Sequence, residues 1–214
     1  MYTPRSYRNE DTHELHALIR RYNFATLFTH RAGESFATHL PFMIDADRGP
    51  HGTLVAHMAR ANPHWRAFAD APPSLVVFLG PHAYISPAWY HHQETVPTWN
   101  YAVVHVTGTP RIVSDDGDMR AMVMRLVDEH EGPLGHPWDV AQAEAVMDVE
   151  MKGIVGFEIA IDRLEGKFKL NQNRAREDQE GVAAALEASG DPSAREIARL
   201  MRARLRNPPD ESNV

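Results

Sequence analysis

The strongest constraint on the fold of this chain is a series of short segments rich in β-branched and aromatic residues, separated by turn residues. Residues 24–30 and 35–44 flank a turn at 31–34, and this arrangement predicts a β-hairpin. Further strands are expected at residues 52–58, 74–79, 97–114 and 154–170. About six or seven strands in a mostly antiparallel order, with helices interspersed, favour a closed or half-open barrel over a doubly wound parallel sheet.

Helical patterns lie between and after these strands. Asp11 precedes an apolar helical pattern and Glu14 completes a capping box, so an amphipathic helix is expected near the start of the chain. Asn62 and Pro63 are an N-cap residue and a proline at the first helical position, which predicts a short helix after the strand 52–58. Further helices are expected at 119–129, at 138–151 and, as a pair divided at 189–192, at 178–205.

Length and composition bound the class of protein. A chain of 214 residues fits a main domain, expected at 1–175, followed by a C-terminal helical extension at 176–214 with a frayed end. Cysteine is absent, which excludes disulfides, thiolate zinc sites and cysteine nucleophiles. No segment approaches the ~20 apolar residues that span a bilayer, so we expect neither membrane insertion nor secretion, and a cytoplasmic location is the default.

The charge of the chain bears on nucleic-acid binding. A net charge of -7 and a pI near 6.0 are opposite in sign to the basic field of proteins that grip phosphate backbones, so any DNA contact must be local. One candidate surface exists, a stripe on the terminal helix formed by Arg195, Arg199, Arg202 and Arg206. We favour the alternative that this stripe is a solvated face, opposite apolar residues such as Ile197 that pack on the barrel.

Five stretches carry polar or aromatic residues that a plain scaffold does not need: residues 38–41, 57–63, 80–90, 96–101 and 167–174. In the second of these, Arg60 lies in the turn between a strand and the helix that Asn62 opens. A helix N-terminus offers free N–H donors, and a guanidinium adds a planar fork that suits phosphate. The alternative is a solvated Arg60 with Asn62 as a plain cap, and the local pattern leaves both open.

Several long motifs of this sequence match, in the same order along the chain, the motifs of a known protein family. They are Met1-Tyr2 with Pro4, His-Met-Ala-Arg-Ala-Asn-Pro-His-Trp, Gly-Pro-His-Ala-Tyr-Ile-Ser-Pro-Ala-Trp-Tyr, Val-Pro-Thr-Trp-Asn-Tyr and Lys-Leu-Asn-Gln-Asn-Arg. Together they closely resemble the PaiB family of FMN-binding negative transcriptional regulators, over roughly residues 1–185. The resemblance implies a split β-barrel like that of pyridoxine-phosphate oxidases and flavin reductases. It also implies a homodimer with FMN in a groove between the two subunits.

The same resemblance implies roles for individual residues. Those expected near the FMN phosphate are His57, Arg60 and Asn62. Those expected beside the isoalloxazine, where backbone amides can pair with the imide edge of the ring, are Thr38, His39 and Leu40. The two most distinctive motifs supply four further residues expected at the FMN site: Ser86, Trp89, Trp99 and Asn100. The residues expected to reach the flavin from the partner subunit are Lys169, Gln172 and Arg174.

Two other functions stay open. The flavin could serve an FMN-dependent oxidoreductase acting on a small molecule, although no dinucleotide fingerprint indicates a dedicated NAD(P)H domain. Alternatively, His91 and His92 with His82 or His105 could bind a metal or haem iron. No metal-ligand spacing supports this second alternative, and adjacent residues on a strand point to opposite faces, so we expect no metal site.

Overall fold

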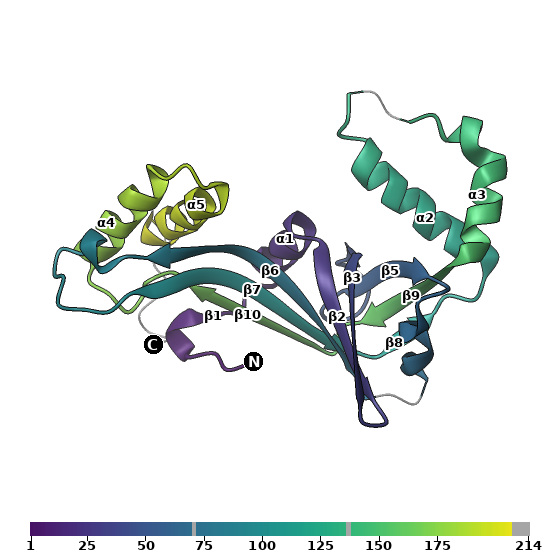
Figure 1. The fold of residues 1–214 in the computed structure, drawn as a ribbon, viewed down its shortest axis with the longest axis horizontal. Coiled ribbons are helices and arrows are strands. Elements are labelled where there is room, and N and C mark those ends of the chain that lie inside the picture. The colour runs from purple at the N-terminus through teal and green to yellow at the C-terminus, as the bar shows by residue number, and fades with distance from the viewer. Residues whose placement is uncertain (70–71, 136–137, 207–214) are drawn as a thin grey trace. The chain divides into compact units, whose positions relative to one another are not determined.

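The computed structural model describes residues 1–69, 72–135 and 138–206, and within them it contains ten strands and five α-helices (Figure 1). The strands are β1 (Arg8–Asn9), β2 (Phe24–Arg31), β3 (Glu34–Pro41), β4 (Met43–Asp45), β5 (Thr53–Ala59), β6 (Ser74–Ile85), β7 (Thr98–Gly108), β8 (Pro110–Ile112), β9 (Ile154–Ala160) and β10 (Arg163–Lys169). The helices are α1 (Thr12–Arg21), α2 (Asp116–Glu131), α3 (Glu144–Glu150), α4 (Arg176–Glu187) and α5 (Pro192–Arg206). Short 3-10 segments are η1 (Arg5–Tyr7), η2 (Pro63–Phe68), η3 (Pro87–Trp89), η4 (Val140–Ala143) and η5 (Met151–Gly153).

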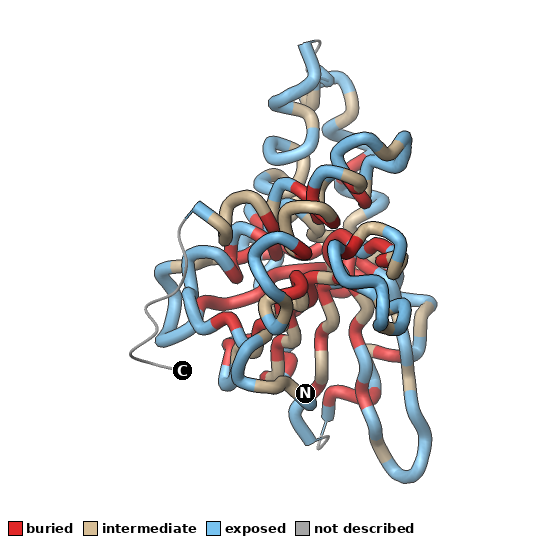
Figure 2. Tube along the Cα trace, turned by 90° about the vertical axis from the view of Figure 1, so that its left-hand side faces the viewer, coloured by how far each residue is buried: buried red, intermediate tan, exposed pale blue. Residues whose placement is uncertain are grey.

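The chain forms two compact units. Unit 1 consists of Met1–Leu18, Phe78–His105 and Glu165–Val214, and unit 2 consists of Ile19–Val77 and Val106–Leu164. The strand pairs β1–β10, β2–β3, β2–β6, β4–β5, β5–β9 and β8–β9 are all antiparallel, as the sequence predicts. Buried residues are concentrated along the strands, while the outer faces of the helices are exposed (Figure 2).

Unit 1 is a sheet covered by helices. Its strands are neighbours in the order β1-β10-β7-β6, and Arg8 pairs with Lys167. The helix α1 begins at the predicted place, because Asp11 Oδ1 accepts hydrogen bonds from the N–H groups of His13 and Glu14. The capping box is not formed, since the Glu14 carboxylate instead accepts from Asn9 Nδ2 at 2.6 Å.

The predicted pair of C-terminal helices is confirmed as α4 and α5, which lie against each other in unit 1 (Figure 1). Their apolar faces are fully buried at Val182 and Leu186 of α4 and at Ile197 and Met201 of α5. Burying a side chain of this size contributes about 1.5–3 kcal/mol, so this helix pair is a substantial part of the core of the unit.

Unit 2 contains the predicted hairpin. The strands β2 and β3 pair from Phe24–Pro41 to Arg31–Glu34, and the two residues between them, Ala32 and Gly33, have φ values of 52° and 86°. Two consecutive positive φ angles match the twist of a two-residue hairpin turn. The predicted second strand is broken after Pro41, because the Phe42 N–H bonds to the carbonyl of Asn23 and leaves the ladder.

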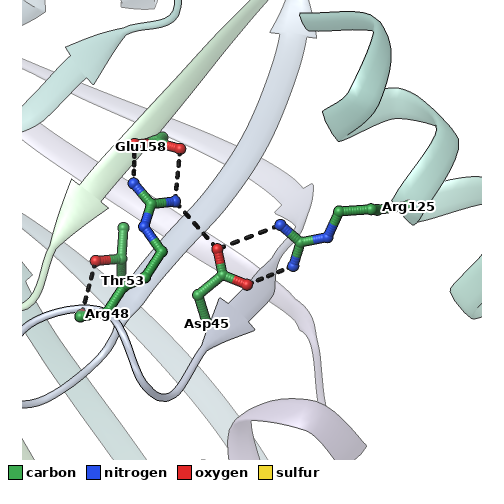
Figure 3. Close-up of polar contacts among 5 residues, drawn as sticks. All are labelled: Asp45, Arg48, Thr53, Arg125 and Glu158. Carbon is green, nitrogen blue, oxygen red and sulfur yellow. Dashed lines mark hydrogen bonds and ion pairs between the residues drawn. The ribbon is translucent and has the colours of Figure 1, made fainter. Parts of the chain in front are cut away.

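A four-stranded sheet in the order β4-β5-β9-β8 completes unit 2, and α2 packs on it. A network of ion pairs joins this helix to the sheet (Figure 3). The Asp45 carboxylate accepts from Arg125 of α2 and from Arg48, which is 3.1 Å away, and Arg48 also forms a bidentate pair with Glu158 of β9 at 2.7 and 2.8 Å. The Arg125 hydrogen bond lowers the pKa of Asp45, and the Arg48 hydrogen bond lowers the pKa of Glu158.

Three predictions about these elements are wrong in part: the end of one strand, the continuity of one helix and the number of strands. The strand expected to end before Gly80 continues to Ile85. β6 lies between β7 and β2, but its register with β2 covers only residues 75–77, so Pro81 takes no ladder bond from that pairing. The helix expected at 138–151 is divided into η4, α3 and η5. The estimate of six or seven strands did not include β1, and three expected segments each divide into two strands: 35–44 into β3 and β4, 97–114 into β7 and β8, and 154–170 into β9 and β10.

The expected frayed end, residues 207–214, lies outside the described residues. Within the described part of the chain, none of the helices is both long and apolar enough to cross a membrane.

Candidate functional site

The structure divides the predicted site residues into two sets. Six belong to unit 2: Thr38, His39, Leu40, His57, Arg60 and Asn62. Seven belong to unit 1: Ser86, Trp89, Trp99, Asn100, Lys169, Gln172 and Arg174. Each set forms a connected arrangement within its own unit.

The turn from β5 into η2 has the predicted order of strand, turn and helix start. β5 ends at Ala59, whose carbonyl accepts from the Asn62 N–H at 2.9 Å. The Asn62 side chain then accepts from the His64 N–H at 3.0 Å, so Asn62 is the N-cap that the sequence predicts. The helix it opens is a single 3-10 segment of six residues.

A polar network joins this turn to β3. Thr38 Oγ1 lies 2.7 Å from His64 Nδ1 and accepts from Asn62 Nδ2 at 3.2 Å. His64 is 1% exposed and stacks on Phe36 with ring centroids 5.5 Å apart. Burial lowers the pKa of His64, so its imidazole is neutral at pH 7. The network fixes the Thr38 side chain against the turn.

His64 is the residue that sequence reasoning missed. It lies in the same motif as His57 and Arg60, directly after the Asn62-Pro63 pair, but nothing in the local pattern indicates that its ring reaches Thr38, 26 residues away. Its Nε2 atom is buried and has no hydrogen-bond partner among the described residues. Such an atom is unusual in a folded protein.

Arg60 is held in one orientation by backbone carbonyls. Its Nε donates to the carbonyl of Lys152 at 2.9 Å, its Nη2 donates to that of Ile154 at 2.8 Å, and its own N–H bonds to Gly153 at 2.7 Å. Neither side-chain bond uses Nη1, and both acceptors are uncharged, so the positive charge is not neutralised by these contacts. The Arg60 guanidinium therefore points toward the start of β9 and does not lie unbound beside the N-terminus of η2.

Arg60 also lines a groove of unit 2 with a volume of about 820 Å³. Trp65, Lys152 and the beginning of α2 form other parts of its wall. Arg120, also in the wall, is paired with Asp148 at 2.7 Å and with Glu144 at 3.1 Å. The volume lies within the range of about 300–1,000 Å³ that is usual for small-molecule and cofactor sites.

The remaining unit 2 residues lie on β3 and β5. β3 ends the strand order, so its outer backbone edge has no strand neighbour within the described chain. On this strand His39 is exposed and its Nδ1 lies 2.9 Å from Thr26 Oγ1, while Leu40 is buried. His57 of β5 is half-buried, and burial lowers its pKa.

In unit 1, polar side chains hold the segment between β6 and β7. Ser86 caps η3 by accepting from the Ala88 N–H at 3.2 Å. Lys169 donates to the Trp99 carbonyl at 2.9 Å and to Thr98. Burial, with the nearby charges of Lys167 and Arg174, lowers the pKa of Lys169.

Arg174 and Gln172 complete this arrangement. Arg174 bonds to Thr95 Oγ1 at 2.6 Å and lies 5.1 Å from the ring centre of Tyr90. Gln172 bonds to backbone groups of Leu170 and Phe168 around its own turn. These side chains therefore position the segment that carries Trp89 and Trp99.

Trp99 and Asn100 face opposite sides of β7. Trp99 is 53% exposed, whereas Asn100 is fully buried with its Nδ2 atom 3.5 Å from Met201 Sδ of α5. The Asn100 Oδ1 atom has no hydrogen-bond partner in the described structure. Of these two neighbours, only Trp99 presents a surface to solvent.

The histidines do not form a metal site within the described residues, where no group of three or more His, Cys, Asp or Glu side chains is arranged to hold an ion. His91 and His92 contact each other edge to face, 4.9 Å between ring centres. The backbone N–H of His91 donates to the buried Asp178 carboxylate at 2.8 Å.

The basic stripe on α5 is largely paired. Arg202 forms a bidentate ion pair with Glu187 at 2.9 Å, and Arg199 bonds to Glu196 at 2.8 Å. Arg195 donates to the carbonyl of Ser189. The opposite face is buried at Ile197 and Met201, so α5 has the arrangement of a solvated basic face over an apolar core.

Antiparallel sheets with helical additions, an edge strand beside a polar turn and a groove of about 820 Å³ define an α+β protein with a candidate small-molecule site. A family model described as "Putative FMN-binding domain" matches residues 1–163. The chain belongs to this family, the PaiB family of FMN-binding split-barrel proteins, and FMN is its cofactor.

Individual relatives support the assignment. Protease synthase and sporulation protein PAI 2 of Bacillus subtilis is 34% identical over 208 residues, which cover 96% of this chain and 99% of that protein. The uncharacterized protein YKL070W of Saccharomyces cerevisiae is 44% identical over 101 residues, which cover 44% of this chain and 59% of that protein.

Solved structures share the fold. The flavocytochrome Anf3 of Azotobacter vinelandii superposes with a TM-score of 0.59 at 15% identity, over 84% of this chain and 78% of that one. The FAD and heme binding protein of Mycobacterium smegmatis gives a TM-score of 0.57 at 19% identity, over 83% and 80% of the two chains. The predicted split-barrel fold is thereby confirmed.

Proposed function

We propose that this chain is a flavin-dependent sensor that acts as a negative regulator, and that it works as a homodimer with FMN bound between its subunits. The kinship with a relative named for protease synthesis and sporulation supports a regulatory role. The paired arginines of α5 favour an indirect effect on transcription over direct reading of DNA by this helix.

The observation that carries the binding proposal is the position of Arg60. Its guanidinium is oriented by two carbonyls, keeps its charge and lines a cofactor-sized groove. A phosphate accepts charge-assisted hydrogen bonds from the Nη1 group, which these two bonds do not use, and no rotamer has to be ordered when the ligand arrives. We therefore assign Arg60 to the FMN phosphate, with His57 and Asn62 shaping the turn beneath it.

The edge of β3 suits the flavin ring. Thr38, His39 and Leu40 lie on a strand that has no strand neighbour on its outer side within the described residues, so their backbone groups can pair with the polar edge of the isoalloxazine. His64 contacts Thr38 through Nδ1, and its buried Nε2 atom has no hydrogen-bond partner within the described residues, so a polar side chain lies beside this part of β3. When bound, FMN supplies hydride and electron transfer chemistry that the side chains of this chain lack.

The partner subunit completes the site in this proposal. Large apolar side chains are exposed on β2 and β6, at Phe24 (68%), Phe28 (41%) and Leu79 (56%), and such residues are typical of contact surfaces. The unit 1 set, from Ser86 to Arg174, approaches the flavin from the partner. Sedimentation of a stable 24.1 kDa monomer at micromolar concentration would contradict this arrangement.

The test is a comparison of FMN and riboflavin, which lacks the phosphate. Arg60→Ala should weaken FMN binding by about 1.5–3 kcal/mol, roughly ten-fold or more, and leave riboflavin binding nearly unchanged. Lysine at this position should restore only part of the loss, because it supplies charge without the planar fork. Flavin fluorescence titrations of both ligands measure the effect.

Arg66→Ala is the matched control. Arg66 is an exposed arginine on the same segment, 5.3 Å from the ring centre of Trp65, and it does not line the groove. Its removal should change neither affinity. Equal losses of FMN and riboflavin in Arg60→Ala would indicate damage to the β5–β9 contact instead of a lost phosphate ligand.

A further inference from the structure

A second cavity, with a volume of about 510 Å³, lies wholly within unit 1. The aromatic side chains His82, Tyr84, Trp89 and Trp99 line it. The rest of the wall comes from α4, α5 and the link between them, with Ala185, Leu186, Ala188, Ser189, Asp191 and Ala194. Neither Arg60 nor any other member of the unit 2 set lines it. The cavity is therefore separate from the proposed phosphate site, although Trp89 and Trp99 of its wall belong to the unit 1 set that the proposed function turns toward the flavin of the partner.

The aromatic rings form a corner. Tyr84 and Trp99 have their ring centres 6.0 Å apart with an interplanar angle of 76°, and His82 lies 6.2 Å from Trp99 on a tilted plane. Tyr84 is 47% exposed and Trp99 is 53% exposed, and both side chains line the cavity. Two π faces at nearly a right angle can surround an ammonium group, which is attracted to the negative face of each ring.

Backbone atoms of Trp99, His82 and Trp89 hold the corner in place. The Trp99 carbonyl accepts from Lys169, and the His82 N–H and carbonyl bond to Ser193 Oγ at 2.9 and 2.7 Å. Trp89 is fixed by the close approach of α4, where a Cβ on Gly181 would lie only 2.6 Å from the Trp89 carbonyl oxygen. A site built this way loses little side-chain freedom when a ligand binds.

The charge of the residues that line the cavity decides whether a cationic or an anionic ligand is favoured. Asp191 lies in the wall, and its carboxylate accepts from the Ser193 N–H at 2.8 Å. The described residues that line the cavity include no lysine and no arginine. A phosphate or carboxylate would meet π faces and a carboxylate without a cationic partner, whereas a cation is favoured by both.

We propose that this cavity binds an organic ammonium ion, with the cationic head in the Tyr84–Trp99 corner near Asp191 and the apolar body against the alanines of α4 and α5. This site goes beyond FMN binding and gives the protein a second ligand. Because the wall joins β6 and β7 to the helix pair, the ligand contacts both layers of unit 1.

Choline is the probe, and its uncharged carbon isostere 3,3-dimethylbutan-1-ol is the reference, in calorimetric titrations of the full chain loaded with FMN. Choline should bind about ten-fold more tightly than the isostere. Asp191→Asn keeps the side-chain oxygen that accepts from Ser193 but removes the charge, and it should weaken choline about five-fold while leaving the isostere unchanged.

A second pair of variants tests the location. Ala185→Leu fills the cavity from the middle of α4 and should abolish choline binding, while Ala184→Leu, at an exposed position outside the lining, should not change it. FMN affinity, measured on the same samples, should stay unchanged in all three variants. Equal affinity for choline and its isostere, or undiminished choline binding in Ala185→Leu, would overturn the proposal even if FMN binds as expected.

Discussion

Asp45 is the centre of the ion-pair network in unit 2, and Asp45→Asn tests whether that network holds α2 on the sheet (Figure 3). The Asp45 side chain is only 16% exposed, but Arg48 and Arg125 are each 50% exposed. Exposed pairs contribute about 0.2–1 kcal/mol, whereas removing one partner of a fully buried pair costs about 3–5 kcal/mol. The intermediate exposure predicts a loss of about 1–2 kcal/mol in the free energy of unfolding at pH 7.

The effect should depend on pH in a defined direction. The pKa values of Asp45 and Glu158 are lowered in the folded protein by their arginine partners. A lowered folded-state pKa gives stability that is complete above the unfolded pKa, near about 4, and is lost as the pH falls through the folded value. The difference between the parent and Asp45→Asn should therefore shrink as the pH falls below about 4.

Urea unfolding at several pH values measures both effects. Asp148→Asn is the matched control, because Asp148 also pairs with an arginine of α2, at 2.7 Å, but is 59% exposed. It should cost less than about 1 kcal/mol. Equal losses in the two variants, or no loss in Asp45→Asn, would refute the reasoning from burial.

Three further predictions concern other parts of the chain. Gly181→Ala should lower the melting temperature although alanine is normally about 1 kcal/mol better in a helix, because the new Cβ would meet the Trp89 carbonyl at 2.6 Å; a stabilised variant would contradict this. Truncation after Gly190 removes the buried Ile197 and Met201 and should reduce thermal stability more than FMN affinity, so unchanged stability is the contrary result. If the flavin turns over as an oxidoreductase, anaerobic NADH or NADPH should bleach bound FMN, and failure of both would favour a sensing role.

Much of the fold could be predicted because the signals are local. The β2–β3 hairpin, the Asn62 cap and the α4–α5 pair follow from turn residues, capping residues and apolar spacing within a few positions. The continuation of β6 through Pro81 could not be predicted in this way. A proline is tolerated there because it lies beyond the residues of β6 that pair with β2, and this depends on the pairing of the whole sheet.

The candidate site shows the same limit. The motif around Arg60 is visible in the sequence, but its carbonyl partners at residues 152 and 154 are about ninety positions away. Likewise, the resemblance predicts that Lys169 and Arg174 reach the flavin, but nothing in the sequence predicts their hydrogen bonds to Thr95, Thr98 and Trp99. Long-range contacts of this kind leave no periodic pattern in the chain, so only the folded structure reveals them.

The most direct test of the central claim is the visible absorption spectrum of the full chain, incubated with FMN and then freed of unbound ligand. The account predicts the two-banded spectrum of oxidised flavin, with about one FMN retained per chain, and a reduced retention in Arg60→Ala. A colourless protein or a haem spectrum would contradict it. So would an Arg60→Ala variant that retains as much FMN and as much riboflavin as the parent protein.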